Sequence, residues 1–122
     1  MYFLLQPRKV GVDYKIEFSN SSCSNATAPD SVRVRVKRRS TVLEVMETVV
    51  DNFGSPYRFS AIYFGSEIGY FIDSINGTAS DLVKNCFWFV FIRAPNGTEL
   101  LSPGVTKFRI PRRNYGIIWR FT

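Results

Sequence analysis

The sequence predicts an α+β fold, in which a mostly antiparallel sheet packs on a single helix. Three observations carry this prediction. Several short segments alternate apolar and polar residues as strands do, and one segment alone has the apolar spacing of an amphipathic helix. The chain has 122 residues, which suits one domain with one core, and no internal repeat divides it. Its 45% hydrophobic and 16% aromatic content is too high for a disordered chain.

The helix is predicted to begin after a cap at Ser40 or Thr41. Thr41 and Glu44 have the spacing of a capping box, in which each side chain bonds the other residue's backbone N–H. The apolar residues that follow lie at helical spacing and form one stripe, which needs a sheet to pack on: Val42, Val45, Met46, Val49 and Phe53. Residues 54–56, Gly-Ser-Pro, end the helix.

The strands are predicted on both sides of this helix. Residues 1–12 are expected to form an N-terminal arm or linker, and residues 13–122 the domain. Residues 69–77 end in Asn76-Gly77, the strongest short-range hairpin signal, and we expect them to share one sheet with residues 87–92. The complete set of predicted strands is 14–18, 32–37, 57–64, 69–77, 87–93, 105–110 and 117–121.

Basic residues give the chain a net charge of +6. They alternate with valines over residues 32–37, and such alternation is typical of a strand with one solvated face. An alternative is nucleic-acid binding, with aromatic stacking, through the following residues: Arg33, Arg35, Lys37, Arg38, Arg39, Arg112 and Arg113. The solvated face is the simpler interpretation, so we expect no nucleic-acid partner.

The chain contains no histidine. This removes the commonest general base and metal ligand, and it excludes a Cys-His catalytic pair. Two cysteines cannot form a structural zinc site by themselves. Near residues 69–77 the only carboxylates that could form an acid-base arrangement are Glu67 and Asp73, the latter beside Ser74. Polar residues on the solvated face of a strand explain them more simply. We therefore expect a protein that is not an enzyme and has no metal site.

The two cysteines, Cys23 and Cys86, are accompanied by four Asn-x-Ser/Thr sequons. Together they favour a secreted, extracellular glycoprotein with a Cys23–Cys86 disulfide. The candidate glycosylation sites are Asn20, Asn25, Asn76 and Asn96. The start of the chain lacks the apolar segment of a signal peptide. We therefore expect either that Met1 is not the natural start or that a longer precursor has been trimmed. No stretch approaches the length of a membrane span.

Five segments come in the order and spacing of a known domain: residues 40–46, residues 69–77, residues 87–89, Leu101-x-x-Gly104-Val105-x-x-Phe108, and residues 118–121. Over residues 31–122 the chain resembles the C-terminal β-domain of the cobalamin carriers, the family of transcobalamin, intrinsic factor and haptocorrin. The resemblance implies a β-grasp-like fold and extracellular cobalamin transport. In that family a helical domain precedes this one, and cobalamin lies between the two.

The resemblance also implies which residues bind the ligand: Glu67, Ile68, Gly69, Tyr70, Phe71, Ile72, Trp88, Phe89, Val90, Phe91, Leu101 and Gly104. Aromatic and aliphatic groups would cover the corrin face, and free strand edges would bond its rim amides. Phe89 stands where carriers often have a polar residue, and residues 93–97 lengthen the adjacent hairpin.

The leading hypothesis is a cobalamin-binding and transport module that covers one face of the corrin ring, with a separate or missing helical domain and possible docking to a cell-surface receptor. The alternative is an extracellular protein-interaction module on the same scaffold that no longer binds cobalamin. Neither would supply an imidazole to cobalt, because the chain has no histidine.

Overall fold

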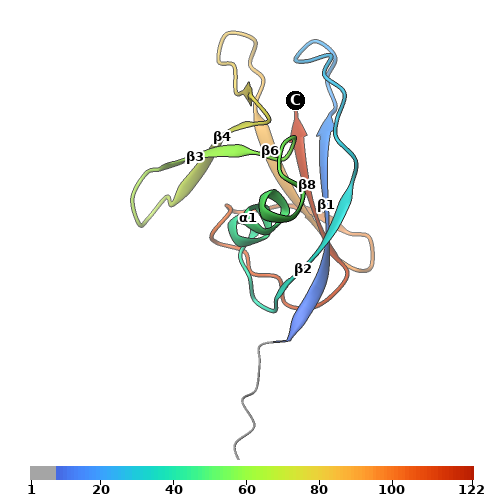
Figure 1. The fold of residues 1–122 in the computed structure, drawn as a ribbon. Coiled ribbons are helices and arrows are strands. Elements are labelled where there is room, and N and C mark those ends of the chain that lie inside the picture. Colours follow the sequence, from blue (N-terminus) through green and yellow to red (C-terminus); the bar gives the residue numbers. More distant parts are fainter. Residues whose placement is uncertain (1–7) are drawn as a thin grey trace, which may run out of the picture.

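The computed structural model describes residues 8–122, which form eight strands and one helix (Figure 1). In chain order these are β1 (Lys9–Phe18), β2 (Val32–Lys37), α1 (Val42–Phe53), β3 (Phe59–Tyr63), β4 (Tyr70–Ile75), β5 (Thr78–Ala79), β6 (Trp88–Arg93), β7 (Glu99–Leu101) and β8 (Tyr115–Phe121). The predicted α+β class, with one helix, is confirmed.

The strands form two sheets. The larger sheet has the order β2-β1-β8-β6-β7, and the smaller one has the order β3-β4-β5. All neighbouring strands are antiparallel except β1 and β8, which run parallel at the centre of the larger sheet. The first and last strands of the described chain are therefore paired side by side (Figure 1).

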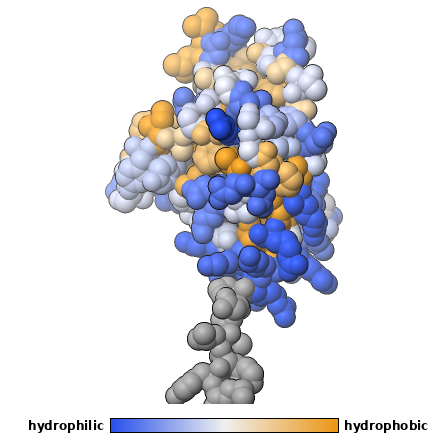
Figure 2. All heavy atoms as spheres, in the orientation of Figure 1, coloured by the Kyte–Doolittle hydropathy of each residue, from blue (hydrophilic) through white to orange (hydrophobic). Residues whose placement is uncertain are grey.

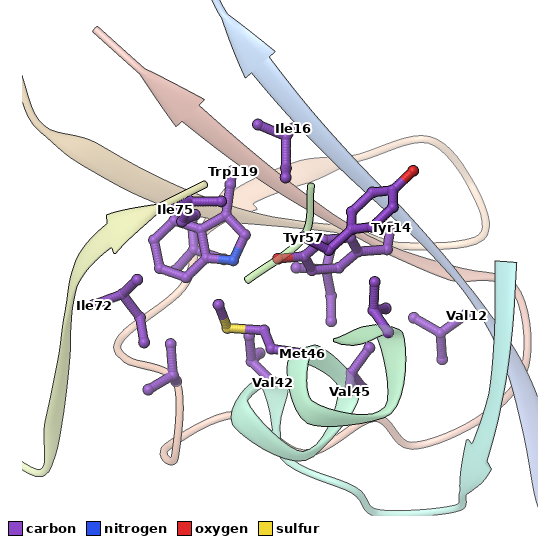
Figure 3. Packing of buried hydrophobic residues seen from close by; sticks show 14 of the residues in the cluster. Val12, Tyr14, Ile16, Val42, Val45, Met46, Tyr57, Ile72, Ile75 and Trp119 are labelled. Carbon is purple, nitrogen blue, oxygen red and sulfur yellow. The ribbon is translucent and has the colours of Figure 1, made fainter. Parts of the chain in front are cut away.

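Helix α1 packs on one face of the larger sheet. The capping box at Thr41 and Glu44 is formed as predicted, and the buried residues of the helix are Val42, Val45, Met46 and Val49. They point at alternate residues of the central strands, including Val12, Tyr14 and Trp119, while Ile72 and Ile75 of β4 close the side of the core (Figure 3). Phe53, the last residue of the predicted stripe, is 45% exposed.

The Asn76-Gly77 hairpin is formed between β4 and β5, and both turn residues have positive φ, 49° and 80°. The expectation that residues 69–77 and 87–92 share one sheet is wrong, because β4 belongs to the smaller sheet and β6 to the larger one. The alternation of apolar and polar residues predicts that each segment is a strand, but it does not determine which other strand pairs with it.

Residues 105–110 do not form the predicted strand. Their backbone bonds the start of the helix instead: Leu43 N donates to Val105 O at 2.9 Å, and Ile110 N donates to Ser40 O at 2.8 Å. A single bridge joins Thr41 to Arg109. Val105 and Ile110 are buried, so the apolar residues of this segment pack a loop onto the core and do not indicate a strand paired in a sheet.

The first strand begins earlier than predicted. β1 starts at Lys9, so residues 9–12, expected in the arm, pair with β2 instead. Residues 1–7 of the expected arm lie outside the described residues.

The predicted disulfide is present between Cys23 and Cys86, with a Cα–Cα distance of 5.7 Å. It joins the loop after β1 to the segment that leads into β6. The four sequon asparagines, at 20, 25, 76 and 96, are all exposed. Their glycosylation stays a prediction.

Candidate functional site

A groove of about 220 Å³ opens where β4 of the smaller sheet faces β6 of the larger one. It is lined by residues of β4, β6, β7, β8 and the loop after β7: Tyr70, Phe71, Ile72, Trp88, Phe89, Val90, Leu101, Ser102, Gly104, Val105 and Trp119. Eight of these eleven residues belong to the predicted ligand-binding set. The fold thus brings together residues that are up to 49 positions apart in the sequence, from Tyr70 to Trp119.

The rim of the groove is made of exposed apolar side chains. Tyr70 and Phe71 are 42% and 43% exposed. Phe89 and Leu101 border the groove as well, but they pair with Arg120 and Phe91, so their side chains lie on the opposite face of the larger sheet. Neighbouring rings hold Tyr70 and Phe71 in place. The ring centroids of Tyr70 and Tyr63 are 5.0 Å apart. Those of Phe71 and Phe64 are 6.2 Å apart, with the rings edge to face.

The floor of the groove is buried, and it contains both tryptophans of the chain. Ile72, Trp88, Val90 and Trp119 are each no more than 6% exposed. Trp88 is fixed by a hydrogen bond from its indole Nε1 to Thr78 O at 2.8 Å. The indole Nε1 of Trp119 is buried and has no hydrogen-bond partner among the described residues.

Two strand edges at the groove have no strand beside them in the described part of the chain. β5 pairs only with Ser74 and Ile75 of β4, so residues 70–72 have one open edge. β7 pairs only with Phe91–Arg93 of β6, and Ser102 N donates to Val90 O, so the edge at Trp88 is open too.

The register indicates which backbone groups are free at these edges. In an antiparallel ladder successive residues direct their N–H and C=O groups to opposite sides. Phe87 and Thr122 exchange backbone hydrogen bonds on the β8 side, which directs the groups of Trp88 away from β8. On β4 an irregularity next to Ser60 and Ala61 of β3 interrupts this alternation, but Phe64 N donates to Gly69 O on the β3 side. Phe71 therefore pairs with Ile62, and Tyr70 and Ile72 direct their groups to the open edge. The free groups of Tyr70, Ile72 and Trp88 therefore border the same groove.

The polar inventory of the groove is small. None of its lining residues carries a charge, and the side-chain hydroxyls are those of Tyr70 and Ser102. Ser102 Oγ donates to Gly104 O at 3.1 Å. No group of three or more potential metal ligands occurs within residues 8–122. The groove is suited to binding an apolar face with a few backbone hydrogen bonds.

Four residues of the predicted binding set lie outside the groove. Glu67 and Ile68 are exposed in the turn between β3 and β4. Gly69 has φ 78° and is buried at the end of that turn, where a Cβ would come within 3.0 Å of Thr106 Oγ1. Phe91 faces the opposite side of the larger sheet, under the guanidinium of Arg120 at 4.7 Å from its ring centroid.

Three lining residues were missed by the sequence reasoning: Ser102, Val105 and Trp119. Trp119 pairs with Val90 in the β6–β8 register and therefore points to the same face. Its alternation with Ile117 and Phe121 was visible in the sequence. The turn that carries Ser102 and Val105 had been assigned in part to a strand.

The opposite face of the larger sheet is charged. Arg120 donates to Glu17 Oε2 at 2.6 Å and to Glu99 Oε2 at 2.9 Å, and Lys15 lies 3.0 Å from Glu17. The hydrogen bond from Arg120 holds the pKa of Glu17 below its ordinary value of 4.5. Arg33 and Arg93 both approach Asp13. The ion pairs of this end of the sheet therefore lie on this face, beside the rings of Phe89 and Phe91.

No helix among the described residues has the length and hydrophobicity that crossing a membrane requires.

No family model and no curated protein sequence matches the chain. A solved structure does: a crystal structure of haptocorrin in complex with Cbi, with a TM-score of 0.70 and 17% sequence identity. The match covers 98% of this chain and 26% of that chain, so the chain spans about a quarter of haptocorrin's length. The resemblance predicted from the sequence is thereby confirmed for the fold, and the chain shares the fold of one domain of haptocorrin.

Proposed function

We propose that this chain is a non-enzymatic binding module that covers one face of a corrinoid with the groove between β4 and β6. One observation carries the proposal: exposed rings and free strand edges converge on the same groove. The haptocorrin structure that shares this fold is a complex with Cbi, a cobalamin precursor, which makes a corrinoid the first ligand to test.

The chemistry of the groove complements that of a corrin. Tyr70 and Phe71 offer exposed apolar surface to the flat ring, at about 25 cal/mol for each Å² removed from water. The free N–H and C=O groups of Tyr70, Ile72 and Trp88 are placed to bond amides on the ring's rim. An uncharged lining avoids the cost of removing an ion from water when the ligand covers it.

The groove is too small to enclose such a ligand. Its volume of about 220 Å³ lies below the roughly 300–1,000 Å³ of pockets that enclose drug-sized molecules. The chain by itself would contact one side, and a second body, such as a helical carrier domain, would contact the other. A linked second domain would raise the affinity through effective concentration.

Quenching of tryptophan fluorescence tests the proposal directly, because Trp88 and Trp119 are the only tryptophans and both line the groove. Titration with Cbi or cobalamin is expected to quench both by energy transfer to the absorbing corrin ring. Phe71→Ala should weaken binding about tenfold, because it removes an exposed ring from the rim. Leu82→Ala is the matched control, because Leu82 is 84% exposed and lies outside the groove.

Absence of saturable quenching at millimolar corrinoid, with and without a helical carrier domain added, would overturn the proposal. Equal effects of Phe71→Ala and Leu82→Ala would place the ligand elsewhere. Tryptophan solutions at the same absorbance correct for the light that the corrin itself absorbs.

A second candidate function is protein recognition, and a specific observation favours it. The apolar surface continues beyond the groove along β3 and the turn after it, where these side chains are exposed: Ile62, Tyr63, Phe64 and Ile68. Exposed aromatic clusters of this kind are typical of protein-binding surfaces. Loss of a partner protein on substitution of Tyr63 or Ile68, with no corrinoid binding by the wild-type chain, would favour this function.

The setting that we propose for either function is extracellular. The Cys23–Cys86 disulfide and four exposed sequon asparagines support it, because disulfides persist in oxidising compartments. A loss of mass on treatment of the secreted protein with an N-glycosidase would establish that it is glycosylated. Cobalamin transport and a cell-surface receptor belong to this proposal as well.

A further inference from the structure

Six exposed arginines gather at the end of the molecule where β1 begins. They come from three segments: the residue before β1, the turn between β2 and α1, and the loop before β8. They are Arg8, Arg38, Arg39, Arg109, Arg112 and Arg113, and we call them the arginine patch. Figure 2 shows a largely hydrophilic surface at this lower end of the molecule, next to the grey residues.

Hydrogen bonds hold the three segments together. Arg38 N donates to Arg8 O at 2.8 Å, and Arg38 Nε donates to Pro111 O at 2.9 Å. Arg39 N donates to Ile110 O at 2.7 Å, and Arg109 Nη1 donates to Arg39 O at 3.0 Å. The patch is therefore a fixed arrangement of neighbouring backbones, not a set of charges scattered over the surface.

Carboxylates do not neutralise the patch. The five ion pairs found among residues 8–122 all lie on the charged face of the larger sheet, and none includes a patch arginine. The acidic side chains of α1 border a separate hollow, which three basic residues share: Lys9, Arg35 and Lys37. The patch carries six positive charges, as many as the net charge of the whole chain, +6.

From this placement we propose that the arginine patch binds a sulfated polysaccharide of the heparan sulfate type. A concentrated positive field attracts a polyanion, and guanidinium groups bind tetrahedral anions with two parallel hydrogen bonds. The disulfide and the exposed sequons favour an extracellular polyanion.

The surroundings of the patch disfavour single-stranded nucleic acid, which stacks its bases on exposed rings. A ring beside the patch is that of Tyr115, which is partly buried and whose centroid lies 6.0 Å from the guanidinium carbon of Arg112. The exposed rings among the described residues, such as Tyr63, Tyr70 and Phe71, lie in other segments than the patch arginines, so the nucleic-acid alternative lacks its stacking platform.

The patch and the groove lie at different ends of β8. Trp119, near the end of this strand, lines the groove, whereas the arginines at 109, 112 and 113 precede its first residue. Polysaccharide binding should therefore leave corrinoid binding unchanged, and the two proposals fail independently of each other.

The test is binding of the whole chain to immobilised heparin over a series of salt concentrations. Two double variants with the same net charge are compared. R112Q/R113Q removes charge from the patch, and R58Q/K84Q removes the same charge from exposed positions outside it. R112Q/R113Q is expected to weaken binding about tenfold at about 150 mM salt, and to lower the slope of log K against log salt by about 2. R58Q/K84Q should change the affinity less than about twofold.

Equal losses in the two double variants would overturn the proposal, because binding would then follow net charge alone. Tighter binding to single-stranded DNA or to phosphatidylserine vesicles than to heparin at the same salt would also overturn it. Competition by heparin, but not by fully desulfated heparin, would support it. Circular dichroism on both variants ensures that the comparison is made between folded proteins.

Discussion

At the scale of single residues, Tyr14 shows how the core accommodates a polar group. Its side chain is fully buried on β1, its hydroxyl has no hydrogen-bond partner among the described residues, and burial raises the pKa of the phenol far above 10.0 (Figure 3). A buried hydroxyl without a partner costs about 1–3 kcal/mol. The ring therefore contributes by packing against its neighbours, including Tyr57 at 6.4 Å.

We expect Tyr14→Phe to leave the free energy of unfolding unchanged or to raise it by about 1–2 kcal/mol, because it removes only the unpaired hydroxyl. Tyr57→Phe is the matched control. The Tyr57 hydroxyl donates to Asp30 O at 2.7 Å, and its loss should cost about 1 kcal/mol. Urea unfolding measures both, and an equal loss in the two variants would contradict this interpretation of Tyr14.

Glu17 carries a prediction about pH. Its hydrogen bond from Arg120 lowers the pKa of the carboxyl below 4.5, so the folded state binds this proton less tightly than the unfolded state does. The stabilisation is therefore fully present above about pH 5 and is lost as the pH falls through the lowered pKa. Glu17→Gln should cost about 1 kcal/mol at pH 7 and should reduce the loss of stability below pH 4.5. An unchanged acid transition would show that other carboxylates control it.

At the scale of elements, the capping box fixes where α1 begins. Thr41 Oγ1 accepts from Glu44 N at 3.2 Å, and Thr41 N donates to Glu44 Oε1 at 3.1 Å. Thr41→Ala should lower the free energy of unfolding by about 1 kcal/mol, whereas Thr41→Ser should retain most of it. Thr48→Ala, in the middle of the same helix, is the control and should be close to neutral. Equal losses of the free energy of unfolding in Thr41→Ala and Thr48→Ala, measured by chemical unfolding, would contradict this role.

The elements also show what the sequence could predict. Local signals were sufficient for α1 and for the Asn76-Gly77 turn, because a capping box and a type I′ hairpin depend on neighbouring residues. The assignment of β4 and β6 to different sheets, and the parallel pairing of β1 with β8, depend on contacts between distant segments. Residues 105–110 had the alternation of a strand, but their backbone groups bond the helix start.

The candidate groove was predictable in part for the same reason. Residues 70–72 and 88–90, which line it, followed from the resemblance to the carriers, because the resembling segments keep their order along the chain. Trp119 follows only from the register of β8 against β6. Phe91 was misplaced relative to the groove because its strand is apolar on both faces, and the apolar pattern does not distinguish them.

At the scale of the whole molecule, the disulfide joins two long loops at the end where β6 begins. Cys23 and Cys86 are 63 residues apart in sequence, and closing a loop of this length should stabilise the fold by about 4 kcal/mol in the chain-entropy description. Cys23→Ser/Cys86→Ser should therefore lower the free energy of unfolding by several kcal/mol. Thermal unfolding of the reduced wild-type protein is the control. A double variant as stable as the oxidised protein would show that the loops are already held by packing.

The molecule as a whole presents two unlike surfaces. One end of the sheets carries an uncharged groove with exposed rings, and the other carries six arginines without carboxylate partners among the described residues. The separation allows a ligand in the groove and a polyanion on the arginine patch to be bound at the same time.

The central proposal, that the groove binds a corrinoid, is tested most directly by ¹H–¹⁵N NMR spectra of the chain during titration with Cbi. The proposal predicts that the amide signals of Tyr70, Ile72 and Trp88 and the indole signals of Trp88 and Trp119 shift together and saturate, while those of the arginine patch stay unchanged. Shifts confined to residues outside the groove, or no shifts at millimolar Cbi, would contradict it.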